Sequence, residues 1–180
     1  MKNIVSEQRP EDLLTEALEA QRGEQTRVDP YQRLRALGIV LPPPPSPVAN
    51  FVPAVREGSL IFLSGQGPVA GNMRHSGTVG IDVSVAEAYQ HARLTGINLL
   101  AVLEYSLGSL LRVKRILKLM GMVHAAPSFA EHPQVINGCS DLLIDVFGPQ
   151  IGRHARSAVG MSSLPGQITV EIEMVASVSD

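Results

Sequence analysis

Residues 156–173 read RSAVGMSSLPGQITVEIE, and they contain the clearest strand pattern in the 180-residue chain. From Ile168 to Ser177, apolar and polar side chains alternate, which predicts a strand with one face in the core. The apolar set is Ile168, Val170, Ile172, Met174 and Ala176, and the polar set is Thr169, Glu171 and Glu173. A shorter strand is predicted from Ala158 to Met161, with Arg156 at its entrance.

Two features of this stretch indicate chemistry. A guanidinium such as that of Arg156 can hold a carboxylate through two parallel hydrogen bonds. Glu171 and Glu173 are expected about 7 Å apart on one strand face, because a strand rises about 3.4 Å per residue. This face is either a solvated sheet surface or, if it packs in an oligomer, a place where the acids need partners such as Arg156.

The chain from Phe51 onward predicts further strands and helices around this stretch. Strands are expected over 51–56, 60–64 and 113–123, the first two forming a hairpin at Glu57-Gly58. A capping box over 84–87 (SVAE) opens an apolar-striped helix that ends at Gly108, and a second helix is expected over 133–147. The glycine-rich segment 65–80 indicates a long loop. The predicted class is α+β, a mixed sheet with two helices packed on one face.

Residues 1–45 are predicted to form an N-terminal extension of short helices and a proline-rich linker, and residues 46–180 the compact domain. Leu13, Leu14, Ala17 and Leu18 have helical spacing, so residues 1 to 27 form either a short amphipathic helix or a mobile tail. A second helix is expected over 31–36, ended by Gly38, and the prolines at 42–45 favour an extended polyproline conformation.

Composition argues against several classes of function. The net charge of −2 gives no electrostatic support for nucleic-acid binding. The single cysteine, Cys139, and the lack of an apolar leader or a membrane-length apolar run predict a cytoplasmic protein. The five histidines show no metal-ligand spacing, and SGQGP at 64–68 lacks the ending of a phosphate loop. We therefore expect no metal, no cofactor and no nucleic-acid or membrane partner.

Several blocks together resemble the RidA/YjgF/liver perchloric-acid-soluble protein family, in its longer chorismate-mutase-like branch. The blocks are ANFVP at 49–53, GSLIFLSGQGP at 58–68, GTVG at 77–80, VING at 135–138 and RSAVGMSSLPGQITVEIE at 156–173. The resemblance runs from about Leu37 to Val178 and implies the chorismate-mutase-like fold. It also implies a homotrimer, in which three sheets form a central barrel, the helices lie outside, and clefts between subunits bind small carboxylate or imine ligands.

The same resemblance implies roles for individual residues. Arg156 would bind the ligand carboxylate and Glu171 would position water, while Ser64 and Asn137 would line the cleft. Active members of the family hydrolyse reactive enamines and imines, such as 2-aminoacrylate, to 2-ketoacids and ammonia. Such a reaction needs a carboxylate clamp, an oriented water and hydrogen bonds to the imine nitrogen, all of which are positioning effects.

The chain also departs from the pattern of the active members at the predicted cleft. Phe51 stands where they have a tyrosine, which removes a hydroxyl donor, and Ala158 stands where they often have a cysteine that acts mainly through its backbone carbonyl. Two functions are therefore open: an enamine/imine deaminase, and a non-catalytic, regulatory module that binds a small carboxylate metabolite. Ribonuclease action has less support because of the acidic balance, and chorismate mutase activity rests on fold likeness alone.

Overall fold

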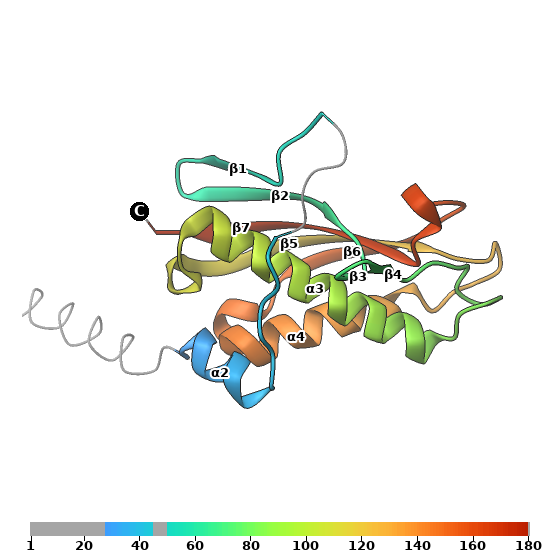
Figure 1. Ribbon diagram of the computed structural model, residues 1–180, viewed down its shortest axis with the longest axis horizontal. Coiled ribbons are helices and arrows are strands. Elements are labelled where there is room, and N and C mark those ends of the chain that lie inside the picture. Colours follow the sequence, from blue (N-terminus) through green and yellow to red (C-terminus); the bar gives the residue numbers. More distant parts are fainter. Residues whose placement is uncertain (1–27, 45–49, 180) are drawn as a thin grey trace, which may run out of the picture.

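The computed structural model describes residues 28–44 and 50–179, so the predicted alternatives for residues 1–27 lie outside the described part (Figure 1). The predicted α+β class is confirmed, with helices on one face of a five-stranded sheet of order β1-β2-β7-β5-β6. Strands β5 and β6 pair in parallel, and the other neighbours in this sheet are antiparallel. The elements are α2 (Pro30–Ala36), β1 (Ala54–Glu57), β2 (Leu60–Gln66), β3 (Val69–Ala70), β4 (Met73–Arg74), α3 (Val85–Leu107), β5 (Val113–His124), α4 (His132–Gly152), β6 (Ala155–Met161) and β7 (Val170–Val178), with short 3-10 turns at Leu110–Arg112 and Pro165–Gln167.

The core lies between this sheet and helices α3 and α4. The alternation predicted for β7 is confirmed, because its apolar side chains are buried under the helices. Thr169 was expected on the polar face and is instead fully buried. It precedes the first residue of β7, and its hydroxyl lies 3.1 Å from Nδ1 of His91 on α3, which satisfies the buried polar atom.

Local sequence signals account for the helix boundaries. The capping box is present: Ser84 Oγ accepts from the Glu87 amide, and the Glu87 carboxylate accepts from the Ser84 amide. The second helix is longer than predicted, because α4 continues through a kink at Gly148, whose φ of 76° favours glycine. Pro149 follows the kink, and the chain returns to the sheet at β6.

The long loop predicted over 65–80 is partly wrong. Gly65 and Gln66 continue β2, and residues 69–74 contain the small β3–β4 pair. The amide nitrogen of Asn98 on α3 donates to the carbonyls of Gly67 and Val69, at 2.9 and 3.0 Å. This buried amide holds the glycine-rich segment against the helix, which a local reading of the segment could not reveal.

The helix predicted over 31–36 is confirmed as α2, and it packs beside α4 (Figure 1). The hydroxyl of Tyr31 accepts a hydrogen bond from the Leu110 amide, at 2.9 Å.

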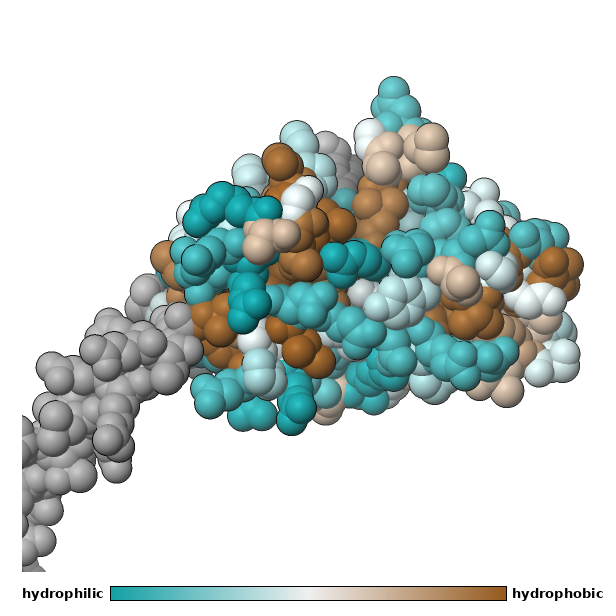
Figure 2. All heavy atoms as spheres, turned by 90° about the horizontal axis from the view of Figure 1, so that it is seen from below, coloured by the Kyte–Doolittle hydropathy of each residue, from teal (hydrophilic) through white to brown (hydrophobic). Residues whose placement is uncertain are grey.

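Figure 2 shows the helix side of the molecule, where hydrophilic residues cover much of the surface between smaller apolar areas. Among the described helices, none is long and apolar enough to cross a bilayer.

Candidate functional site

The residues predicted to line a cleft form two groups in the structure. Asn137, Arg156 and Ala158 belong to α4 and β6, at one edge of the sheet. Ser64 and Glu171 belong to β2 and β7, on the other side of β5. The fold does not bring the two groups together within one chain.

Arg156 lies on β6 and points toward α4. It is half-buried; its Nη1 donates to Ser140 Oγ at 3.0 Å, and its Nη2 donates to the Pro133 carbonyl at 3.1 Å. Asn137 lies between these two positions on the same helix face, because residues four and seven apart share a face. Among the described residues, no carboxylate forms an ion pair with Arg156. The guanidinium is therefore a half-buried positive charge that lacks a countercharge in the described part of the chain.

Arg156 is also the end of a hydrogen-bonded chain. Ser140 Oγ lies 3.0 Å from Nε2 of His154, and Nδ1 of His154 lies 2.6 Å from the Gly152 carbonyl oxygen. Burial lowers the pKa of His154, the Gly152 carbonyl opposes this shift, and the positive charge of Arg156 adds to the lowering. His154 is therefore neutral at physiological pH.

Glu171 occupies the opposite side of the sheet, next to an irregularity in β2. Between Leu63 and Gln66, β2 has one residue more than the paired part of β7, which is a β-bulge. The bulge places Gly65 against the Glu171 carboxyl, so closely that a side chain at Gly65 would overlap it. Burial raises the pKa of Glu171, and the negative charge of Glu173 raises it further.

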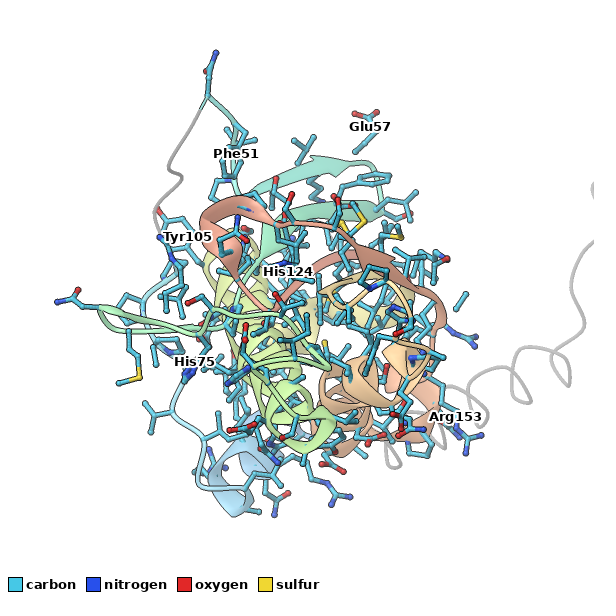
Figure 3. All side chains as sticks on the ribbon, turned by 90° about the vertical axis from the view of Figure 1, so that its right-hand side faces the viewer. Phe51, Glu57, His75, Tyr105, His124 and Arg153 are labelled. Atoms are coloured by element: carbon cyan, nitrogen blue, oxygen red, sulfur yellow. The ribbon has the colours of Figure 1, made fainter. Side chains whose placement is uncertain are left out.

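Ser64 lies on β2, the strand next to the β7 strand of Glu171, and it binds the segment that follows Phe51. The Ser64 hydroxyl donates to the Val52 carbonyl at 2.7 Å, and the Ser64 amide donates to the Pro53 carbonyl at 3.0 Å. These bonds hold the segment that carries Phe51 beside β2, and the Phe51 side chain is 43% exposed. Phe51 and Arg153, which is three residues before Arg156, lie at opposite corners of the view in Figure 3.

Arg156 and Glu171 lie on opposite faces of the sheet. Arg156 pairs in register with Leu119, which is buried under the helices, whereas Glu171 pairs with Met122 and points away from them. Strand β5 separates the two strands, so their backbones are about 10 Å apart. A small ligand cannot touch both side chains of one chain, and a partner role of Arg156 for Glu171 is not realised within the chain.

The sheet face that carries Glu171 is not covered by any described helix, and it also carries large apolar side chains. Phe62 is 45% exposed and Val55 is 54% exposed, although both are large apolar residues. Their register partners extend the same face across the sheet. We call this surface the open face; its apolar members are Val55, Phe62, Met120, Met122, Val159 and Val175.

Other predicted residues have structural roles. Ala158 pairs with Gly121 and packs on the core, so its side chain adds no polar contact near Arg156. Cys139 is fully buried, and burial raises the pKa of its thiol to about 12, so the thiol serves to pack the core. Among the described residues, no cluster of histidine, cysteine and carboxylate side chains could hold a metal ion.

Sequence reasoning missed Ser140 and did not connect His154 with Arg156. Ser140 lies three residues after Asn137, so helical spacing placed it near the arginine once the α4 face was known. The link to His154 depends on the return of the chain after the Gly148 kink, which no local pattern indicated.

Comparison with known proteins agrees with this fold. Protein TCP17 of Trypanosoma cruzi is 39% identical over 150 residues, which cover 82% of this chain and 92% of that protein. Atu1372 of Agrobacterium tumefaciens, a solved structure of unknown function, is 41% identical with a TM-score of 0.75 over 82% of this chain and 92% of its own. A structure from Shewanella oneidensis, described as a putative endoribonuclease, is 33% identical with a TM-score of 0.80 over 83% and 99%. Escherichia coli TdcF, solved with bound serine, is 26% identical with a TM-score of 0.54 over 76% and 94%.

The match to a family covers a similar share of the chain. Residues 31–176 match the sequence profile described as "YjgF/chorismate mutase-like, putative endoribonuclease". This range contains α2, the whole sheet up to Ala176 and both groups of candidate site residues. The chain therefore belongs to the YjgF/chorismate mutase-like family.

Proposed function

We propose that this chain forms a homotrimer whose inter-subunit clefts bind small carboxylate metabolites and hydrolyse reactive enamines and imines to 2-ketoacids and ammonia. The observation that carries the proposal is the half-buried Arg156, which has no carboxylate partner among the described residues. Burying a charge without a partner is costly, so a guanidinium held in this way favours an anionic ligand.

The open face supports assembly into an oligomer. Val55 and Phe62 are large apolar side chains that are exposed side by side on this face, and such exposed apolar groups mark interaction surfaces. In a trimer with the open faces turned inward, these residues would be covered, and Glu171 of one chain would approach the exposed edge strand β6 of a neighbour. Each cleft would then combine Arg156 of one chain with Glu171 of a neighbouring chain. This arrangement is consistent with the placement of the two residues on opposite faces of one chain.

The chemistry follows from these two groups. Arg156 would bind the carboxylate of 2-aminoacrylate, whose enamine tautomerises to the imine. Water adds to the imine carbon as the C=N π electrons move to nitrogen; the nitrogen takes a proton from solvent, and Glu171 accepts a proton from the attacking water. The protonated Glu171 returns its proton to the amino nitrogen of the resulting carbinolamine, and ammonia leaves as the C–N bond breaks. The hydroxyl gives its proton to solvent and becomes the ketone of the 2-ketoacid. The raised pKa of Glu171 makes its carboxylate a stronger base than an ordinary glutamate.

The TdcF likeness supports the class of ligand. That protein was solved with bound serine, a small molecule with a carboxylate and an amine. For this chain we propose only the class of ligand that carries both a carboxylate and an amine. The carboxylate agrees with the preference of Arg156 for an anionic ligand.

The test measures ammonia release from enzymatically generated 2-aminoacrylate. We expect the purified protein to accelerate release, Arg156→Ala to abolish the acceleration, and Arg153→Ala to retain it, because Arg153 is exposed on the same segment. Light scattering is expected to give three times the chain mass of 19.3 kDa. A rate of ammonia release equal to that in buffer would contradict the proposed enzymatic activity. A monomeric mass would contradict the proposed inter-subunit cleft.

A second candidate is a non-catalytic module that binds a small carboxylate metabolite. Phe51 favours it, because this residue precedes the Val52 carbonyl bound by Ser64 and its ring has no hydroxyl to offer to a ligand. In that case pyruvate should raise the melting temperature of the wild type by mass action, and not that of Arg156→Ala, while no ammonia is released. RNA cleavage, which the family description names, has no support in the net charge of −2.

A further inference from the structure

The hydrogen-bonded chain that ends at Arg156 has defined directions. The Gly152 carbonyl can only accept, so Nδ1 of His154 must carry the proton in their 2.6 Å contact. In the neutral ring Nε2 is then an acceptor, and Ser140 donates its hydroxyl proton to it at 3.0 Å. The oxygen lone pairs of Ser140 are therefore left for Arg156, whose Nη1 donates to them at 3.0 Å.

Both ends of this chain are anchored. Gly152 is buried against the preceding part of α4, where a Cβ would lie 2.8 Å from the Cα of Ile144. The Gly152 carbonyl is thus held in place by backbone packing, and it fixes the tautomer of His154. At the other end, the Pro133 carbonyl accepts from Nη2 of Arg156.

The charged groups around His154 leave Arg156 as its main electrostatic neighbour. On α4, Asp141 accepts from Tyr89 and Asp145 pairs with Arg93, so both acids face α3. On β5, Lys118 donates to Ser157. The positive charge of Arg156 therefore acts on a neutral imidazole. The Ser140 hydroxyl lies between them; the imidazole orients it, and it accepts from Arg156.

We propose that Ser140 and His154 are positioning residues that hold the Arg156 guanidinium in the orientation in which it receives a ligand carboxylate. The carboxylate ligand in this proposal rests on the proposed function, whereas the directions of the hydrogen bonds do not. Two of the five N–H groups of the guanidinium are used by Ser140 and Pro133, and three remain for a carboxylate. Neither positioning residue is expected to touch the reacting atoms.

The first test needs no ligand. In nitrogen-15 NMR spectra of the full chain, we expect His154 to be the neutral Nδ1–H tautomer and the Arg156 guanidinium to rotate slowly. Ser140→Ala should speed this rotation, whereas Ser140→Thr, which keeps a hydroxyl acceptor, and Ser106→Ala, an exposed serine on α3, should leave it slow. An Nε2–H tautomer, or slow rotation that persists in Ser140→Ala, would overturn the proposal.

The second test uses pyruvate, the 2-ketoacid product of 2-aminoacrylate hydrolysis, in isothermal titration of the same folded variants. Losing a hydrogen bond to a charged group should weaken binding by about tenfold in Ser140→Ala. Ser140→Thr and His154→Gln, whose amide oxygen can accept from Ser140, should recover most of the affinity. Equal affinities in wild type and Ser140→Ala would overturn the proposal. Failure of the wild type to bind pyruvate would count against the proposed function, and the spectra would still decide the positioning.

Discussion

The substitution Gly65→Ala tests the placement of Glu171 with one methyl group. Gly65 lies in the β2 bulge, and a Cβ built on its backbone would lie 2.9 Å from Glu171 Cδ and closer still to Oε1. The backbone at Gly65 has no positive φ, so alanine fits its conformation. The overlapping atoms are the end of a flexible side chain, so Glu171 is expected to rotate away while the backbone stays in place.

The effects on stability and on activity should differ widely. Replacing glycine by alanine in a compatible conformation changes the free energy of unfolding by at most about 1 kcal/mol, and often in the stabilising direction. Displacing a catalytic carboxylate by about 1 Å can cost about 10²-fold in rate. We therefore expect a nearly unchanged melting temperature together with a large loss of 2-aminoacrylate hydrolysis.

The assay compares ammonia release and thermal unfolding of Gly65→Ala with those of Gly67→Ala. The control is matched because a Cβ at Gly67 would press on the end of the Ile168 side chain, at 2.8 Å, and not on Glu171. The control should keep most of its activity. Full activity in Gly65→Ala would show that Glu171 does not act from this position, and unfolding of Gly65→Ala would show that the carboxyl cannot rotate away.

Four further predictions concern titration, thiol reactivity and the cleft aromatic. Removing the negative charge in Glu173→Gln should lower the pKa of Glu171 and move the acid limb of the pH–rate profile to lower pH; an unmoved limb would assign that limb to another group. Because the folded-state pKa of Glu171 is raised, its ionisation costs stability as pH rises, so Glu171→Gln should raise the melting temperature at pH 8 more than at pH 4. Cys139 is fully buried and the pKa of its thiol is about 12, so a thiol reagent at neutral pH should modify it only after denaturation, and rapid labelling of native protein would contradict the packing. Phe51→Tyr should raise the hydrolysis rate by supplying a hydroxyl that a ligand can bind, with little change in stability because the side chain is 43% exposed.

The elements that the sequence predicts well are those whose pattern is local. The alternation from Ile168 to Ser177 predicts β7 because one face of that strand must be buried, and the capping box at Ser84 and Glu87 predicts the first residue of α3. Both signals act over a few residues, and both are confirmed.

The parts that the sequence does not predict depend on contacts between distant segments. The strand order places β5 between β6 and β7, and the pairing register puts Arg156 and Glu171 on opposite faces; neither strand's own pattern contains this. Thr169 is buried because His91, far away in the sequence, lies beside its hydroxyl. The hydrogen bonds that link the Gly152 carbonyl, His154, Ser140 and Arg156 likewise form only because the polypeptide kinks in α4 and returns to the sheet.

Subunit complementation tests most directly the claim that each site is built from two chains. Arg156→Ala and Glu171→Gln are each expected to be inactive as homotrimers. In trimers assembled at random from equal amounts of both, about a quarter of the clefts combine an intact Arg156 with an intact Glu171, so about a quarter of the wild-type ammonia release should return. Activity of the mixed trimers that stays at the level of the separate variants would contradict the account.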